Sequence, residues 1–448
     1  MYENKNIVIL GFGKSGFASA KVLSKNNKVT LVDIKCKDKH DKHQIKKLKN
    51  LGVTLILGNE PINILEHIDI LVKNPGVPLT HKYVSFCEKK DIPVVNEVEI
   101  AYSLINKDVT YITITGSNGK TTTCALLYEI LKQGTKKVFL TGNIGYSLIN
   151  IVDEVKDKDI VIVEVSSHQL TNMFDFKSNI SVLLNIYQTH LDFFKDYDHY
   201  KYNKARVFNN HTSDELAIIN KDNKEAMDVV NKINSNKKYF SMNDESCLSY
   251  VKDNFIWYKK EKIINLDKLK IVGKHNYENI MACVIIAKEL NISNDIISNT
   301  ICLFKGVKHR LELISVINGI KFINDSKSTN MTSSKMAVNA LDGNIILLLG
   351  GLDRNEEYNI DSVVKDCKKV ISFGNVTSKI KEECDKINIE CISCNSIKEA
   401  IIKAFKTADN GDLILLSPGF ASWDAFDSYE ERGIYFKQIV KELENEFN

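Results

Sequence analysis

The chain has 448 residues, which is too long for a single hydrophobic core and is typical of about three domains. Its hydrophobic content of 44% and charged content of 26% are those of an ordinary globular protein, and a net charge of +3 gives no reason to expect nucleic acid or an anionic membrane as partner. No apolar run approaches the roughly 18 residues that a membrane-spanning helix needs. We therefore expect a soluble protein.

The beginning of the chain and its cysteines predict the compartment. MYENKNIVILGFG runs straight into a strand, so we expect no secretory signal. The ten cysteines follow no repeating framework, which indicates reduced thiols in a cytoplasm. Cys391 and Cys394 form a C-x-x-C with Cys384 nearby, but no second ligand pair stands at zinc spacing. We interpret these three as ordinary thiols.

The first predicted domain, residues 1–96, opens with an apolar strand at 7–10, the motif GFGKSG and a helical pattern. A second strand ends in Asp33. Glycines between a strand and a helix let backbone N–H groups approach a phosphate, which predicts a Rossmann-like nucleotide-binding domain. On the motif and its acid alone, an NAD-dependent dehydrogenase stays open.

The second predicted domain, residues 97–306, contains ITITGSNGKTTT, which resembles a P-loop with one glycine missing. The common spelling G-x-x-x-x-G-K-[ST] requires glycine at the position of Ile114. The preceding strand, two glycines, the Lys-Thr pair and the following helix remain, so we expect Lys120 to contact nucleotide phosphates and Thr121 to bind Mg²⁺. A plain strand, turn and helix is the alternative.

Two further strands of this domain carry chemistry at their carboxyl ends. Glu164 ends the apolar run IVIVE, and His190 and Asp192 follow the next strand in NIYQTHLD. A lone carboxylate in a buried strand is costly unless it meets a cation. The shared edge predicts a second divalent-metal site, although a structural role for either residue stays open.

The rest of the chain predicts more α/β structure. Residues 238–272 read as short strands of a small antiparallel insert, which two helices follow. The third domain, residues 307–448, opens with a hairpin at Asn318 and Gly319, a dipeptide that suits a type I′ turn. Strands NIILLLGG, VISFG and DLILLS then alternate with helices, which predicts parallel sheets.

Seven stretches resemble, in order, the signatures of the Mur ligase family across essentially the whole chain. They are GSNGKTTT, EVSSHQL, NIYQTHLD, GKHNYENIMA, GVKHRLE, NDSKSTN and LSPGFASWDAFDSYEERG. The shorter G-x-x-G-K-T is that family's form of the P-loop. The resemblance implies three α/β domains: a Rossmann-like UDP-binding domain, a central ATP-binding domain with a parallel sheet, and a Rossmann-like C-terminal domain that binds the amino acid.

The GFGKSG unit and the last signature resemble the D-glutamate-adding members of that family. The resemblance implies an ATP- and Mg²⁺-dependent amide ligase that adds D-glutamate to UDP-N-acetylmuramoyl-L-alanine through an acyl phosphate, in peptidoglycan precursor synthesis. We expect a cytoplasmic monomer with no nucleic-acid or membrane partner. The alternatives are a ligase that adds L-alanine or the third residue, a folate polyglutamate synthase, and a regulator that binds nucleotides without ligation.

The resemblance also implies roles for individual residues, with Lys120, His190 and Lys204 as the catalytic ones. ATP is expected at Gly116, Asn118, Gly119, Lys120, Thr121, Thr122, Asn279, Arg310 and Asp325. Metal ions are expected at Thr121, Glu164, His190 and Lys204, with Lys204 carbamylated by CO₂. The UDP substrate is expected at Ser15, Asp33, Lys35 and Asn143, and D-glutamate at Lys327, Thr329, Arg354, Ser422, Trp423 and Tyr429.

Some of these positions keep an alternative or depart from the family pattern. Lys204 has the alternative of an exposed lysine on a helix, and Thr329 and Ser422 have that of helix caps. Arg354 stands where the family commonly has lysine, and Trp423 where it has a smaller apolar residue. The amino-acid pocket is therefore where we expect this chain to differ in detail.

Overall fold

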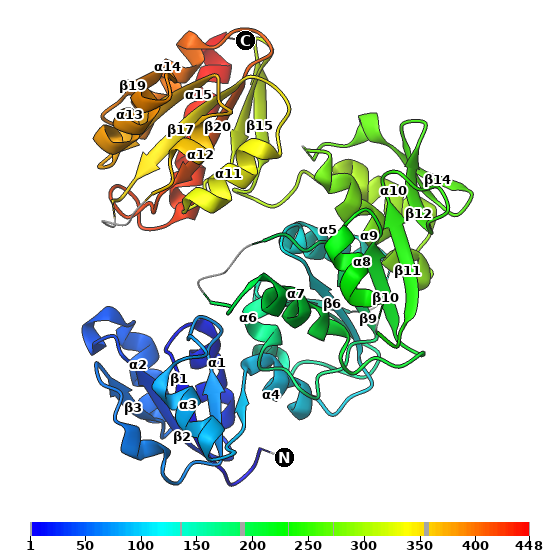
Figure 1. Ribbon diagram of the computed structural model, residues 1–448, viewed down its shortest axis with the longest axis vertical. Helices are drawn as coiled ribbons and strands as arrows, with labels where there is room; N and C mark the ends of the chain where they lie inside the picture. Colours follow the sequence, from blue (N-terminus) through cyan, green and yellow to red (C-terminus); the bar gives the residue numbers. More distant parts are fainter. Residues whose placement is uncertain are drawn as a thin grey trace. The chain divides into compact units, whose positions relative to one another are not determined.

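The computed structural model describes residues 2–134, 137–188, 193–231, 233–271, 273–353 and 358–447. Three sheets alternate with helices (Figure 1), and this confirms the predicted α/β class with parallel sheets. By internal packing the chain divides into two compact units, Met1–Ile264 with Tyr277–Ser298, and Asn265–Asn276 with Asn299–Asn448. The first unit holds two of the sheets, and the predicted domain limits after residues 96 and 306 remain a proposal.

The first sheet has five parallel strands in the order β3-β2-β1-β4-β5. They are β1 (Asn6–Leu10), β2 (Lys28–Asp33), β3 (Thr54–Leu57), β4 (Ile70–Lys73) and β5 (Val94–Val95), with helices α1 (Lys14–Leu23), α2 (Lys42–Asn50) and α3 (Lys82–Lys89). The strand order reverses between β1 and β4. Open parallel sheets bind ligands at such a switch point, which here lies beside the GFGKSG loop.

The second sheet has nine strands in the order β14-β13-β12-β11-β10-β9-β6-β8-β7. They are β6 (Thr110–Thr115), β7 (Val138–Gly142), β8 (Ile160–Glu164), β9 (Ile180–Leu183), β10 (Leu216–Asn220), β11 (Asn236–Ser241), β12 (Ser249–Lys252), β13 (Phe255–Tyr258) and β14 (Glu261–Asn265). The P-loop strand β6 lies between β8 and β9, so the carboxyl ends of these three parallel strands meet at one edge. This edge carries the site described below.

The predicted antiparallel insert is wrong in its first part. Strand β11 is parallel to β10, and β12 to β11, so the central sheet continues; β12 and β13 then form an antiparallel hairpin. The cause is the helix between β10 and β11, α8 (Lys224–Val230), because a helical crossover returns the chain to the same end of the sheet. The other helices of the central part are α4 (Glu97–Leu104), α5 (Lys120–Gly134), α6 (Ser167–Leu170), α7 (Tyr197–Ala205), α9 (His275–Glu289) and α10 (Asn294–Leu303).

The third sheet has six strands in the order β15-β16-β20-β17-β18-β19. They are β15 (Glu312–Ile317), β16 (Ile320–Asn324), β17 (Ile345–Gly351), β18 (Lys369–Gly374), β19 (Cys391–Ser393) and β20 (Leu413–Gly419). The predicted hairpin is confirmed, because Asn318 and Gly319 both have positive φ, 50° and 76°. One hydrophobic cluster covers each face of the sheet, under α11 (Met331–Asn339), α12 (Asp361–Val364), α13 (Thr377–Lys386), α14 (Ile397–Thr407) and α15 (Tyr429–Phe447).

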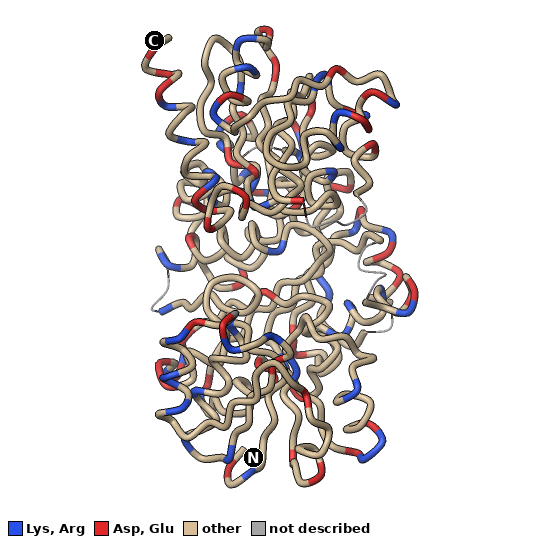
Figure 2. The backbone as a smooth tube through the Cα atoms, turned by 90° about the vertical axis from the view of Figure 1, so that its left-hand side faces the viewer, with Lys and Arg blue, Asp and Glu red and all other residues tan. Residues whose placement is uncertain are grey.

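The distribution of charged positions agrees with the balanced charge of the sequence. Basic and acidic positions are interspersed along the backbone in Figure 2. Among the described helices, none combines the length and the apolar character that crossing a bilayer requires. All ten cysteines are free thiols.

Candidate active site

The P-loop takes a conformation that only its glycines permit. Gly119 has φ 83°, and a Cβ added there would collide with the amide oxygen of Asn279 on α9. The hydroxyl of Thr123 lies 2.9 Å from the carbonyl oxygen of Gly119 and 3.1 Å from Asn279 Oδ1. Helix α9 is thus held directly against the loop, and the structure brings Asn279 to the predicted nucleotide site.

The remaining loop residues are anchored by the segment after β9. The N–H of Ser117 donates to the carbonyl of Asn185 (3.0 Å), and the N–H of Asn118 donates to its Oδ1 (2.9 Å). Lys120 Nζ donates to the loop carbonyls of Gly116 (2.7 Å) and Ser117 (2.9 Å). Its charge therefore lies over the loop, where phosphate is expected. Thr121 and Thr122 are buried in the first turn of α5.

Glu164 is a buried carboxylate, and one of its two oxygens accepts a hydrogen bond. It is 1% exposed at the carboxyl end of β8, and its Oε1 accepts from Asn143 Nδ2 at 2.9 Å. Oε2 is buried and has no hydrogen-bond partner within the described residues. Burying an unsatisfied carboxylate oxygen is costly, whereas a hard cation such as Mg²⁺ prefers oxygen ligands. Glu164 therefore fits the metal site that the sequence predicts.

Lys204 is buried rather than exposed, so the alternative of an exposed helix lysine is wrong. It is 1% exposed on α7, its Nζ donates to Ser167 Oγ at 2.8 Å, and the described part of the chain pairs no carboxylate with it. Burial lowers the pKa of Lys204 well below its ordinary value, and the charge of Lys120 lowers that pKa further. Both effects favour the neutral form of the amine.

Tyr200, which the sequence reasoning missed, links Lys204 to the P-loop. Its hydroxyl lies 2.7 Å from Ser117 Oγ, and its ring lies 5.0 Å from Lys204 Nζ. Both residues are on α7 four positions apart, which places them on one face of the helix. That spacing is the signal that the sequence offered. Asn185, also missed, stands inside the motif NIYQTHLD.

The glycine-rich loop after β1 is braced by Asn74, which follows β4 across the switch point. Asn74 Oδ1 accepts from Ser15 Oγ at 3.1 Å, and its Nδ2 donates to the carbonyl of Gly11 at 3.0 Å. A Cβ on Gly11 would lie 2.8 Å from this amide nitrogen. Asn74 is not singled out by the sequence analysis, although its place after a central strand is a usable signal.

Asp33 is occupied by backbone groups at the end of β2. Its Oδ2 accepts from the N–H of Phe12 (2.6 Å) and its Oδ1 from the N–H of Lys35 (2.8 Å). The side chain of Lys35 is exposed. Asp33 thus fixes the two loops that border the switch point.

The third sheet brings Asp325 to the end of β16. Asp325 is 2% exposed, its Oδ2 accepts from Ser417 Oγ at 2.8 Å and its Oδ1 from the N–H of Leu311 at 3.2 Å. Burial raises the pKa of Asp325 to about 6, while hydrogen bonds and the charge of Arg310 oppose that rise. Arg310 therefore lies close enough to act on this carboxylate.

Two loops at the same edge of that sheet carry the residues predicted to bind the amino acid. Lys327 and Thr329, on the first loop, are half-buried; on the second, Ser422 is buried, and Trp423 is 65% exposed. Burial raises the pKa of Tyr429, at the start of α15, to about 12. A helix-cap role for Thr329 is wrong, because the side chain of its neighbour Asn330 caps α11. Ser422 lies in a turn well before α15.

A buried arginine ties these two loops together. Arg432 on α15 is 1% exposed; its Nε donates to Ser326 Oγ and its Nη2 to the carbonyl of Ser326, both at 3.1 Å. Its Nη1 donates to the carbonyl of Phe420 at 3.1 Å. Ser326 precedes Lys327, and Phe420 lies shortly before Ser422, so one guanidinium sets the spacing of both loops.

Two predicted site residues, His190 and Arg354, lie outside the described residues, as does Asp192. Their roles therefore stay predictions. Among the residues that are described, no three His, Cys, Asp or Glu side chains gather around a common metal position.

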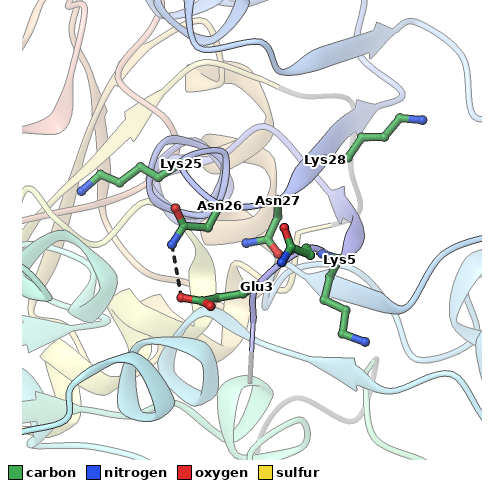
Figure 3. Close-up of a pocket in the computed structure, with 7 residues that line it drawn as sticks. Glu3, Lys5, Lys25, Asn26, Asn27 and Lys28 are labelled. Carbon is green, nitrogen blue, oxygen red and sulfur yellow. Dashed lines mark hydrogen bonds between the residues drawn. The ribbon is translucent and has the colours of Figure 1, made fainter.

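A hollow elsewhere in the first sheet does not coincide with this chemistry. It has a volume of about 680 Å³ and is lined by the segments Glu3–Lys5 and Lys25–Lys28, which precede β1 and β2. It therefore lies at the opposite end of the strands from the glycine-rich loop. The amino groups of Lys5, Lys25 and Lys28 point away from one another (Figure 3), so they form no shared anion site.

The comparisons with known proteins agree with this arrangement. Residues 5–96 match the family described as Mur ligase MurD-like, N-terminal domain, residues 114–287 the Mur ligase middle domain, and residues 309–420 the Mur ligase, glutamate ligase domain. A curated relative from Bacillus thuringiensis (strain Al Hakam), named UDP-N-acetylmuramoylalanine--D-glutamate ligase, is 38% identical over 99% of this chain and 98% of its own length.

Solved structures share the fold at low identity. The MurF ligase of Thermotoga maritima in complex with ADP has a TM-score of 0.58 and 15% identity, over 99% of this chain and 95% of that one. A bifunctional folylpolyglutamate synthase/dihydrofolate synthase of Yersinia pestis, complexed with AMPPNP and a Mn ion, has a TM-score of 0.55 and 15% identity, over 83% of this chain and 99% of that one. At such identities the likeness establishes the fold alone. The family matches and the 38% identical relative together establish that this chain belongs to the Mur ligase family.

Proposed function

We propose that this chain joins D-glutamate to the alanine carboxylate of UDP-N-acetylmuramoyl-L-alanine, with ATP as the source of energy, in peptidoglycan precursor synthesis. The observation that carries the proposal is a relative of that name, 38% identical over 99% of this chain. The MurD-like match over residues 5–96 supports the UDP substrate and argues against a folate enzyme.

The reaction needs activation, because a carboxylate does not condense with an amine at neutral pH. Attack of the alanine carboxylate on the γ-phosphorus of ATP gives an acyl phosphate and ADP. The glutamate amine then attacks the acyl carbon, and phosphate leaves from a tetrahedral intermediate. In this proposal Lys120 neutralises charge that develops on the transferred phosphoryl group, and the position of its amino group over the loop carbonyls supports that role.

The residues at the end of β8 fit a divalent metal. Glu164 Oε2 would be one ligand, with Thr121 holding the ion at the nucleotide. Bound Mg²⁺ supplies charge neutralisation at the phosphate oxygens. Asn143 holds the other oxygen of Glu164 at 2.9 Å and so fixes the direction of the carboxylate. His190, outside the described residues, completes the proposed set.

Carbamylation of Lys204 would turn a cation that repels a metal into an anion that binds one. A neutral amine is the form that reacts with CO₂: an N–C bond forms and one proton leaves to solvent. Support comes from the burial of Lys204 and from the lowered pKa that burial and Lys120 cause. Lys204 Nζ already donates to Ser167 Oγ, three residues beyond Glu164 in the chain.

The second carboxylate of D-glutamate explains why two cations are predicted in the third domain. Burying a carboxylate requires a cation or several hydrogen-bond donors. Lys327 and Arg354 would supply two cations, whereas a site for alanine, which has one carboxylate, needs only one. The half-buried Tyr429, with a pKa raised to about 12 by burial, keeps its proton and can donate a hydrogen bond. We include in the proposal domain limits after residues 96 and 306 and a cytoplasmic monomer; the family matches 5–96, 114–287 and 309–420 support those limits.

An ADP-release assay with a panel of amino acids tests the function. The expected result is ADP release that requires both the UDP-muramoyl substrate and D-glutamate, with L-glutamate and D-alanine rejected. Inversion at the α-carbon moves the amine away from the acyl phosphate if both carboxylates stay bound. If L-alanine, L-lysine or diaminopimelate is the best acceptor, the substrate assignment fails. If no acceptor stimulates ADP release, a regulator that binds nucleotides without ligation becomes the better interpretation.

A further inference from the structure

Four cysteines gather near the outer strands of the third sheet, on two different faces. Cys384, at the end of α13, and Cys391, in β19, lie in the hydrophobic cluster on one face, which also contains Cys367. Cys394 belongs to the cluster on the opposite face. The C-x-x-C of the sequence is therefore divided by the sheet, and its two thiols do not face each other.

Cys384 and Cys391, by contrast, share the cluster on one face of the sheet. Their thiols are close enough for each to shift the pKa of the other, and Cys391 Sγ lies 3.8 Å from Ser372 Oγ on β18. The backbone supports this pairing, because the N–H of Ile389 donates to the carbonyl of Cys384 at 3.0 Å in the short turn between α13 and β19. Cys391 is half-buried, whereas Cys384 is fully buried.

The different environments of the two thiols suit Cys391 to attack and Cys384 to resolve. The neighbouring Cys384 thiol, with help from the Ser372 hydroxyl, lowers the pKa of Cys391, although burial opposes this. The Cys391 thiol and burial raise the pKa of Cys384. A reactive cysteine is one with thiolate character, access to solvent and a resolving thiol beside it, and Cys391 meets these conditions.

We propose that Cys384 and Cys391 are a modification site, at which a low-molecular-weight disulfide reversibly oxidises the pair to a disulfide bond. The Cys391 thiolate attacks one sulfur of the small disulfide, an S–S bond forms, and one small thiolate leaves. Cys384 then gives up its proton and attacks Cys391 Sγ, which forms the internal bond and releases the second small thiolate. The protein loses two protons and two electrons, and the small disulfide is reduced to two thiols.

Peptide mapping tests the proposal on the full-length protein. Reduced protein, freed of reductant, is incubated with oxidised glutathione, quenched in acid, alkylated with iodoacetamide and digested with trypsin. Cleavage after Lys381, Lys386 and Lys398 separates the two thiols into peptides 382–386 and 387–398. The expected product is these two peptides joined, lighter by two hydrogens, with Cys394 alkylated, and reversal by dithiothreitol.

Two variants separate the proposed pair from its neighbours. Cys394→Ser removes a buried thiol of the other face and should leave the cross-link unchanged. Cys384→Ser should replace the cross-link by glutathione that remains on Cys391. The proposal is overturned by a disulfide inside peptide 387–398, by a cross-link that disappears in Cys394→Ser, or by wild-type protein in which Cys391 stays reduced or carries only glutathione. Because the wild-type map decides by itself, a variant that fails to fold does not remove the test.

Discussion

Burying a lysine is costly unless a carboxylate pairs with it, and among the described residues no carboxylate pairs with the buried Lys204. Lys204 is 1% exposed, and its amino group donates a hydrogen bond to Ser167 Oγ. A cation there is costly, so burial favours a neutral or chemically changed side chain. Both possibilities are open to experiment.

We predict that Lys204→Ala lowers ligase turnover steeply and that added formate or acetate restores part of it. A small carboxylate would enter the space of the proposed carbamate and supply the missing anion. The matched control is Lys201→Ala on the same helix, because Lys201 pairs with Asp198, Glu225 and Asp228 instead. Near-normal turnover of Lys204→Ala in bicarbonate-depleted buffer would exclude the carbamate.

The amino group of Lys120 is predicted to serve ATP and not the UDP substrate. Lys120→Ala should abolish ADP release while titration calorimetry still detects the UDP-muramoyl substrate with unchanged affinity. The reason is that Nζ lies over the carbonyls of Gly116 and Ser117, in the loop of the second sheet. Lys132→Ala, an exposed lysine of the same helix, is the control. An equal loss of UDP-substrate affinity would contradict the assignment.

Glu97 is predicted to make stability fall with rising pH. Burial raises its pKa to about 7, although the N–H of Ile149 donates to it at 2.8 Å. The native state therefore holds a proton that the unfolded chain loses near pH 4.5. The stabilisation is complete below pH 4.5 and is lost as the pH rises through about 7, by about 3 kcal/mol.

Urea unfolding at pH 5 and pH 8 measures this effect. Glu97→Gln should remove the pH-dependent part, since an amide keeps the acceptor oxygen and does not ionise. Glu154→Gln, a change of an exposed glutamate, is the control. An equal pH dependence in wild type and Glu97→Gln would show that Glu97 is not the titrating group.

At the scale of elements, the contact between the P-loop and α9 gives a graded test. Gly119→Ala should weaken ATP binding and stability together, because its φ of 83° is left-handed and the new Cβ collides with Asn279. Gly52→Ala measures the backbone strain alone, because Gly52 has φ 77° but a Cβ there meets nothing within 4 Å. We expect it to lower the free energy of unfolding by about 1–2 kcal/mol. Equal unfolding midpoints of the two variants would show that the new Cβ of Gly119→Ala causes no further destabilisation.

The elements also show where sequence reasoning succeeds and where it stops. The hairpin at Asn318 was predictable because a local φ requirement selects Asn-Gly. The parallel placement of β11 was not, because it depends on which sheet edge is free, and that is a property of the assembled sheet. Likewise the burial of Glu164 was predictable, because a charged residue stands inside an apolar strand. The role of Asn74 was not, because it contacts a loop that is distant in sequence.

At the scale of the whole molecule, the division into two compact units predicts unfolding that is not two-state. The second unit consists of Asn265–Asn276 and Asn299–Asn448 and has its own sheet and clusters. Scanning calorimetry without ligands should give two transitions, or one whose calorimetric enthalpy exceeds its van't Hoff enthalpy. A single transition with equal enthalpies, unchanged at a second scan rate, would contradict this.

Arg432 has a consequence for any redesign of the proposed amino-acid site. The two loops that carry Lys327 and Ser422 come from distant parts of the chain, yet one guanidinium holds Ser326 and Phe420 in register. If only one loop were replaced by that of another enzyme, its hydrogen bonds to the Arg432 guanidinium would be lost, and with them the spacing of the two loops. The smallest portable unit is therefore both loops together with the first turn of α15.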